Sequence, residues 1–225
     1  MILETENTTK MNKTELLNFI EEYPIIPVFY NDDLEICKNI LKSCYEGGIR
    51  VFEFVNRGTK AKNNFCELLN YKEQNFPDLI LGIGTILNKD TALDFLRLGA
   101  QFIVSPIFKE ELAQVAIEKD CLWIPGCMTP TEIIVANEAG CQLIKLFPGD
   151  TLGPGFLKSI RPLFPQIKFM PTGGVEVSEE NIKTWFAASV SAVGLGSKLF
   201  KISQDEYNYQ EISDSCSKLL KWAKN

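Results

Sequence analysis

The feature that most constrains the fold of this chain is a row of eight short apolar runs that recur at nearly regular intervals. Their first residues lie 20 to 29 positions apart, which is the length of one strand, one helix and two loops. Near-continuous apolar strands that alternate with helices indicate parallel strands covered on both sides. The runs occupy residues 25–30, 50–56, 79–85, 102–106, 122–126, 142–148, 167–172 and 191–196.

Helical patterns fill the segments between these runs. Residues 32–48 carry apolar side chains on one face and end at a glycine pair. Residues 129–140 begin with Thr129 as N-cap and with Glu132 three positions on, which is the pattern of a capping box. Further helices are predicted for residues 178–188 and, at the C-terminus, for residues 204–225.

An additional helix is predicted before the first run, at residues 12–20, where Asn12 and Glu15 have the spacing of a second capping box. Eight strand–helix units favour a single-domain (β/α)8 barrel, the TIM barrel, with residues 25–200 in the barrel and residues 1–225 in the domain. The additional helix would cover the bottom of the barrel. The alternative is an open doubly wound sheet, whose usual G-x-G-x-x-G pattern after the first strand is absent.

The composition argues against several classes of function. A formal net charge of −6 does not suit a nucleic-acid surface. No apolar run is long enough to span a bilayer, and the start of the chain lacks the pattern of a secretory signal, so we expect a cytoplasmic protein without a membrane partner. Seven scattered cysteines without a C-x-x-C pair favour free buried thiols over disulfides or a zinc site. The absence of histidine removes the commonest general base and metal ligand.

Two charged residues are predicted to point into the barrel. Because side chains alternate along a strand, Glu53 lies on the same face as Val55, whereas the large Phe54 faces the helices. The same alternation places Lys145 on one face with Phe147. Each strand therefore brings one charged group to an otherwise apolar interior, close to the strand end at which barrels carry their functional residues.

Two interpretations of this pair are open. Glu53 and Lys145 could form a buried structural ion pair, since buried charges are usually paired. They could instead be a catalytic lysine and its carboxylate partner. An apolar pocket disfavours the charged form of an amine, and a neutral amine can attack a ketone to form a Schiff base. A glutamate can transfer the protons that this reaction requires.

Glycines mark a second candidate site. Gly173 and Gly174 follow the seventh run directly, and Gly196 and Ser197 follow the eighth. The loops after the last two strands of a barrel often bind phosphate through backbone N–H groups and the N-terminus of a short helix, which Ser197 would cap. Thr85, at the end of the third run, is expected to direct its hydroxyl into the site.

Six segments in order resemble one protein family. They are GIRVFEF, LGIGTILN, GAQFIVSP, PGCMTPTE, IKLFP and PTGGV, and the resemblance continues in register from residue 25 to residue 200. The chain resembles the 2-keto-3-deoxy-6-phosphogluconate (KDPG) aldolase / 4-hydroxy-2-oxoglutarate (KHG) aldolase family. The resemblance implies a homotrimeric class I aldolase that cleaves a 2-keto-4-hydroxy acid to pyruvate and an aldehyde, without a metal or other cofactor.

The resemblance also implies residue roles. Lys145 in IKLFP is similar to the Schiff-base lysine, and Glu53 in RVFEF to the acid/base residue. The expected substrates are KDPG, 4-hydroxy-2-oxoglutarate or both, with 2-dehydro-3-deoxy-6-phosphogalactonate as the alternative. The implied pyruvate contacts are Arg57, Thr85 and Phe147, and the implied phosphate site comprises Gly173, Gly174, Gly196 and Ser197.

The chain departs from the common family pattern at two places. The usual E-V-T-L-R-T is replaced by EFVNRGT, which removes hydroxyl groups but keeps the spacing from Glu53 to Arg57. FPGD replaces the more common F-P-A, and Asp150 adds a charge near the mouth of the site. Two other functions are compatible with the pattern: a phosphate-binding barrel such as a sugar-phosphate isomerase or decarboxylase, and a non-catalytic barrel that binds a phosphorylated keto acid.

Overall fold

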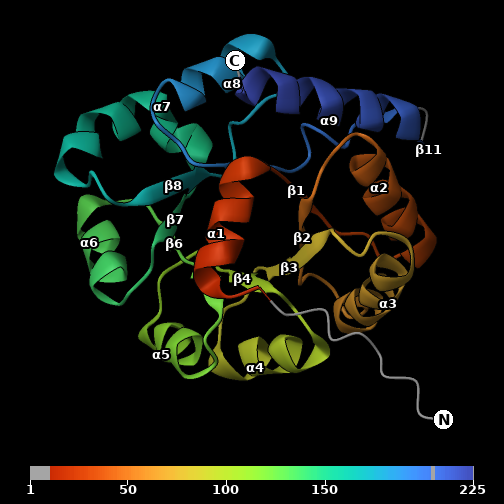
Figure 1. Cartoon of the computed structure of the whole chain (residues 1–225), viewed down its shortest axis with the longest axis horizontal. Coiled ribbons are helices and arrows are strands. Elements are labelled where there is room, and N and C mark those ends of the chain that lie inside the picture. The colour runs from red at the N-terminus through yellow and green to blue at the C-terminus, as the bar shows by residue number, and fades with distance from the viewer. Residues whose placement is uncertain (1–10, 204–205, 225) are drawn as a thin grey trace.

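Strands and helices alternate along the chain in the order that the apolar runs predict. The structure is a computed structural model, and it describes residues 11–203 and 206–224 (Figure 1). The parallel strands are β1 (Ile25–Phe29), β2 (Val51–Val55), β3 (Ile80–Gly84), β4 (Phe102–Val104), β5 (Leu122–Ile124), β6 (Gly126–Cys127), β7 (Leu143–Leu146), β8 (Lys168–Pro171) and β9 (Val193–Leu195).

Helices surround these strands (Figure 1). They are α1 (Lys13–Glu22), α2 (Leu34–Glu46), α3 (Ala61–Asn75), α4 (Lys89–Leu98), α5 (Glu110–Glu118), α6 (Pro130–Glu138), α7 (Gly149–Ile160), the 3-10 helix η1 (Arg161–Leu163), α8 (Glu179–Phe186) and α9 (Tyr209–Ala223). Among the helices of the described residues, none is long and apolar enough to cross a membrane.

The strands form two curled parallel sheets. One has six strands in the order β5-β4-β3-β2-β1-β9, and the other has three in the order β6-β7-β8. The predicted run 122–126 is divided at Pro125 into β5 and β6, so the chain itself connects the two sheets there. At the other junction, an isolated parallel bridge joins Thr172 to Gly194. The sheets therefore curl around a common interior.

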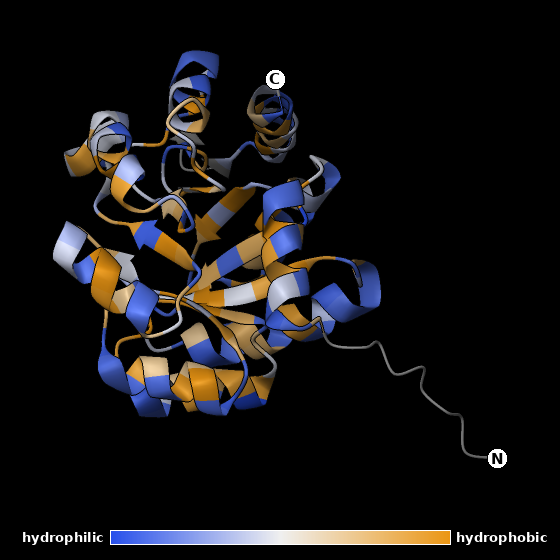
Figure 2. Cartoon of the chain, turned by 60° about the vertical axis from the view of Figure 1, so that its left-hand side comes forward, coloured by the Kyte–Doolittle hydropathy of each residue, from blue (hydrophilic) through white to orange (hydrophobic). Residues whose placement is uncertain are grey.

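Side-chain alternation divides the core into two layers, as the sequence predicts. Phe52 and Phe54 of β2 belong to the large apolar cluster between strands and helices. Val51 instead belongs to a smaller cluster inside the curled sheets, together with Leu143 of β7. Figure 2 shows the result: apolar residues concentrate on the strands and on the inward helix faces, while the outward helix faces are mainly hydrophilic.

Helix α1 occupies the position expected for the additional helix at 12–20. Asn12 and Glu15 form the predicted capping box. Leu16, Leu17 and Ile20 of α1 are buried against residues at the amino ends of the strands, such as Val51 and Leu143. In Figure 1 the helix lies across the middle of the ring of strands. One end of the interior is thus closed by apolar side chains.

Other predicted helix starts agree with the structure. Thr129 and Glu132 form the second capping box at α6, and Ser178 caps α8 through the N–H of Asn181. The cysteines within the described part of the chain form no disulfide with one another, and most of them are buried.

Two predictions about helices were wrong. The C-terminal helix begins at Tyr209 and not at 204, because an antiparallel pair, β10 (Ile202–Ser203) and β11 (Glu206–Tyr207), precedes it. Residues 204, 205 and 225 lie outside the described residues. Ser197 does not cap a helix: residues 197–199 form a turn in which the N–H of Leu199 bonds the carbonyl of Gly196.

Candidate active site

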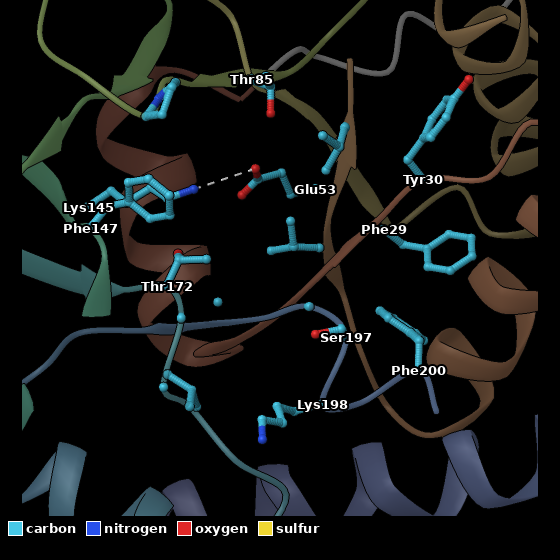
Figure 3. Close-up of a pocket in the computed structure, with 18 of the residues that line it drawn as sticks. Phe29, Tyr30, Glu53, Thr85, Lys145, Phe147, Thr172, Ser197, Lys198 and Phe200 are labelled. Atoms are coloured by element: carbon cyan, nitrogen blue, oxygen red, sulfur yellow. Dashed lines mark ion pairs between the residues drawn. The ribbon is translucent and has the colours of Figure 1, made fainter. Parts of the chain in front are cut away.

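A cavity of about 670 Å3 opens at the carboxyl ends of the strands, at the end of the interior opposite α1. Figure 3 shows several of its side chains, which come from many different strands and loops. The cavity brings together every site residue that the sequence singled out. These are Glu53, Arg57, Thr85, Lys145, Phe147, Gly173, Gly174, Gly196 and Ser197.

Lys145 and Glu53 form a buried pair in this cavity. Lys145 Nζ lies 3.9 Å from Glu53 Oε1, and the side chains are only 7% and 1% exposed. This distance is short enough for an ion pair but too long for a hydrogen bond. Neither side chain is therefore fixed in position by a hydrogen bond to the other. The ring of Phe147 lies 5.1 Å from Lys145 Nζ, close enough for a cation–π contact. The pair is visible at the centre of Figure 3.

The neighbouring strand makes room for Glu53. β2 and β3 pair in parallel, with Val55 opposite Gly84. A Cβ atom at Gly84 would lie 1.9 Å from Glu53 Oε1, so any side chain there would displace the carboxylate. Gly84 therefore allows β2 and β3 to pack closely, so that the Glu53 carboxylate can lie across β3.

Burial raises the pKa of Glu53 above its ordinary value, and the positive charges of Lys145 and Arg57 counteract part of this effect. Glu53 Oε2 is buried and has no hydrogen-bond partner within the described part of the chain. A carboxyl group is suited to accept and return a proton at neutral pH when its pKa is raised and one of its oxygens has no hydrogen-bond partner.

The rim of the cavity carries Arg57 and Thr85. Arg57 is exposed in the segment that follows β2, and it faces the same cavity as Glu53. Thr85 has a φ of 60°, a left-handed conformation that is uncommon for a β-branched residue. This conformation turns the hydroxyl of Thr85 towards the cavity, as Figure 3 shows.

The glycine loops border the other side of the cavity. Gly173 and Gly174 have φ values of 87° and 67°, which a side chain would strain. A Cβ at Gly174 would also lie 2.6 Å from Cα of Asp150. At Gly196, by contrast, a Cβ would make only an ordinary contact, 3.7 Å from the carbonyl of Val28. Local packing thus explains the glycine pair but not Gly196.

Thr172 is a cavity residue that the sequence reasoning missed. Its hydroxyl is buried without a hydrogen-bond partner among the described residues, and it lines the cavity. Met170, two positions earlier, belongs to the inner apolar cluster, so strand alternation also directs Thr172 inward. That signal was available in the sequence. Tyr30 and Lys198 also line the cavity and were not singled out.

The described residues contain no group of three or more Asp, Glu, Cys or His side chains placed to hold a metal ion. The polar side chains of the cavity are instead two amines, a guanidinium, two carboxylates and several hydroxyls. This set is suited to bind an anionic keto acid and to transfer protons.

Replacement of Lys145 by methionine should raise the pKa of Glu53 further, because the positive charge that opposes the effect of burial is lost. A titration of the glutamate carboxyl carbons by 13C NMR would measure this. Lys183→Met, at an exposed ion pair on α8, is the control and should leave the pKa of Glu53 unchanged. An unchanged or lower pKa in Lys145→Met would contradict the electrostatic coupling.

The raised pKa of Glu53 also predicts how the free energy of unfolding changes with pH. A carboxyl group with a raised pKa in the folded state binds more protons there than in the unfolded chain. Its contribution to the free energy of unfolding is present below the unfolded pKa and is lost as pH rises through the folded pKa. In Lys145→Met this loss should be completed at a higher pH.

Comparisons with known proteins agree with this site. The model of the family described as KDPG and KHG aldolase matches residues 16–215. A 2-dehydro-3-deoxy-phosphogluconate aldolase of Dickeya dadantii is 32% identical over 184 residues, which are 81% of this chain and 84% of the relative. A 2-dehydro-3-deoxy-6-phosphogalactonate aldolase of Escherichia coli is 33% identical over 141 residues, 59% of this chain and 68% of the relative.

One solved structure adds chemical information about a relative. The KDPG aldolase of Legionella pneumophila, with pyruvate captured as a covalent carbinolamine intermediate, is 29% identical to this chain. The two superpose with a TM-score of 0.80, over 91% of this chain and 98% of the other. The family match over nearly the whole chain, the relatives and the cavity geometry lead to one conclusion: this protein is an aldolase of the KDPG and KHG aldolase family.

Proposed function

We propose that this protein is a metal-independent class I aldolase in which Lys145 forms a Schiff base with substrate. It would reversibly cleave KDPG to pyruvate and glyceraldehyde 3-phosphate, 4-hydroxy-2-oxoglutarate to pyruvate and glyoxylate, or both. The observation that carries the proposal is the buried Lys145–Glu53 pair in the cavity. The carbinolamine of pyruvate in the Legionella relative supports it, because a carbinolamine is the adduct of an amine and a ketone.

The reaction begins with proton transfer from the Lys145 ammonium to the Glu53 carboxylate, 3.9 Å away. The neutral amine attacks the C2 ketone to give a carbinolamine. Glu53 then returns the proton to the departing hydroxyl, and loss of water gives an iminium ion and leaves Glu53 as a carboxylate again. Glu53 is the natural proton carrier for these steps because its pKa is raised and Oε2 is unoccupied.

Cleavage follows from the iminium ion. Glu53, directly or through a water molecule, takes the proton of the C4 hydroxyl as the C3–C4 bond breaks, and the electron pair of that bond moves into the iminium to form an enamine. The aldehyde leaves, C3 is protonated, and water hydrolyses the resulting pyruvate iminium to restore Lys145. Arg57 would hold the substrate carboxylate by a bidentate contact, while Thr85 and Phe147 border the pyruvate end.

A second candidate substrate is 2-dehydro-3-deoxy-6-phosphogalactonate. It is favoured by the 33% identity to the Escherichia coli relative named for that substrate. The two phosphorylated substrates are epimers, so the same lysine chemistry serves both, and the choice would depend on contacts to the C4 hydroxyl. The buried, partnerless hydroxyl of Thr172 is one group placed to make such a contact.

We also propose that the two curled sheets form one (β/α)8 barrel. Both junctions between them support this arrangement: the continuous chain through Pro125, and the bridge from Thr172 to Gly194. In this barrel β5 and β6 together form one strand, which gives eight strands in all. Helix α1 is additional to the eight strand–helix units. The whole chain would form a single domain and would work in the cytoplasm.

Lys145 should be trapped by borohydride in the presence of pyruvate, because reduction makes the Schiff base permanent. Mass spectrometry of peptides should locate one reduced pyruvate adduct at Lys145. Lys145→Met should give no adduct and lose retro-aldol activity by at least about 1,000-fold, whereas the surface variant Lys183→Met should behave like the wild type. An unmodified Lys145, or full activity in Lys145→Met, would refute the proposal. Ligand binding without turnover would favour the non-catalytic alternative.

Phosphorylated substrates should be preferred if the loops after β8 and β9 bind phosphate. We expect higher kcat/KM for KDPG or its galactose epimer than for 4-hydroxy-2-oxoglutarate. Ser197→Ala should lower kcat/KM for the phosphorylated substrates about 10-fold, the effect of one hydrogen bond to a charged group. Ser159→Ala, on the exposed face of α7, is the control. Equal values for all substrates would refute the role assigned to Gly173, Gly174, Gly196 and Ser197.

A homotrimer is the proposed assembly, and exposed apolar side chains support it. Leu87, Ile107 and Met128 are 42%, 44% and 41% exposed and lie in the segments that follow β3, β4 and β6. The last two loops touch, since a Cβ at Gly126 would lie 3.0 Å from the backbone N of Ile107. Large apolar side chains gathered at one rim are typical of a surface that another protein covers.

Light scattering after size-exclusion chromatography should therefore give three times the chain mass. Ile107→Glu should shift the protein towards monomers, because it introduces a charge into the apolar rim. Ile117→Glu, at a 66% exposed position on α5, should leave the mass unchanged. A monomeric wild type would contradict the assembly without affecting the lysine chemistry.

A further inference from the structure

Tyr30 stands where the loop after β1 meets the segment after β2. Its ring lines the cavity, and its hydroxyl donates a hydrogen bond to Asp32. In Figure 3 the hydroxyl points away from the Lys145–Glu53 pair, towards the outer part of the site. Tyr30 is therefore not oriented to exchange a proton with the reacting atoms, and another role must be sought for its hydroxyl.

The hydroxyl of Tyr30 lies against Gly58. A Cβ at Gly58 would be 2.7 Å from Tyr30 Oη and 3.3 Å from Asp32 Oδ1, so a side chain at this position would collide with the hydrogen-bonded pair. Gly58 also has a φ of 70°, which disfavours other residues. The backbone of Lys60 also lies near enough to the Tyr30 hydroxyl to lower its pKa, though less than the other causes raise it. The phenol thus lies against the 57–60 segment.

The loop that carries Asp32 is itself held in place. The side-chain amide of Asn64, which is buried in the first turn of α3, donates hydrogen bonds to the carbonyls of Asn31 and Asp32 at 3.1 and 3.2 Å. The exposed segment 57–60 therefore leads into α3 and is contacted at Gly58 by the anchored Tyr30–Asp32 pair. Within the described residues, the side chain of Arg57 makes no hydrogen bond that could orient it instead.

We propose that Tyr30 is a positioning residue, which holds the 57–60 segment so that the Arg57 guanidinium faces the carboxylate of the keto acid. This inference rests on the proposed function, in which Arg57 binds that carboxylate. Tyr30 is suited to the task because its hydroxyl stays protonated: desolvation, followed by the hydrogen bond and the charge of Asp32, raises its pKa to about 12. The contact therefore persists across the pH range in which the enzyme would work.

The test is a double-mutant cycle with steady-state kinetics on KDPG. Tyr30→Phe should raise KM about 5-fold, the effect of one neutral hydrogen bond, and leave kcat within 2-fold, because the hydroxyl does not touch the reacting atoms. In an Arg57→Met background, Tyr30→Phe should have no further effect on KM, since its action passes through Arg57. Tyr45→Phe is the matched control: the Tyr45 hydroxyl donates to Asp78 at 2.7 Å outside the cavity, and its loss should not change KM.

A second pair of variants keeps the inference testable if Tyr30→Phe lowers stability. Asp32→Asn retains an acceptor for the Tyr30 hydroxyl and should stay near wild-type KM, whereas Asp32→Ala should raise KM as Tyr30→Phe does. An unchanged KM in Tyr30→Phe, or effects that simply add in the double mutant, would overturn the role of Tyr30. A wild type that is inactive and forms no pyruvate adduct would instead refute the proposed function itself.

Discussion

The buried pair of Lys145 and Glu53 is the interaction on which the site depends. Removing an ammonium and a carboxylate from water costs several kcal/mol for each ion, and an attraction across 3.9 Å without a hydrogen bond recovers only part of that cost. Such a pair contributes little to stability. In the mechanism proposed above its value is chemical, because burial raises the pKa of Glu53 and so prepares that carboxylate to accept a proton.

The rest of the fold divides its tasks between the two ends of the interior. At the amino ends of the strands, Leu16, Leu17 and Ile20 of α1 close the interior with apolar side chains. At the carboxyl ends, the interior stays open and polar groups replace apolar ones. TIM barrels, the fold proposed above, commonly keep stability at one end and chemistry at the other. Mutations in α1 should thus affect folding, and those around Lys145 activity.

Much of this arrangement could be predicted from the sequence because it depends on periodicity. The spacing of the apolar runs located the strands. The alternation of side chains along each strand placed Glu53 and Lys145 inside the curled sheets, on the face opposite the helix-facing Phe54. Features that depend on contacts between distant segments could not be predicted. The turn after Gly196 was expected to be a helix, and the β10–β11 pair was not expected, since short turns and two-residue strands carry no periodic signal. The glycine in EFVNRGT could be explained only from the structure, because Tyr30 packs on Gly58 from another loop.

The charges around the glycine loops define how an anion would have to be recognised there. Lys198 lies 3.7 Å from Glu176 and is partly neutralised by it. Asp150, the charge added by FPGD, accepts the N–H of Thr151 in the first turn of α7, and its Oδ1 would lie 3.4 Å from a Cβ at Gly173. This side of the cavity therefore carries no excess of positive charge. A phosphate bound there would depend on directed backbone N–H groups and the Ser197 hydroxyl, which discriminate by geometry, more than on long-range attraction.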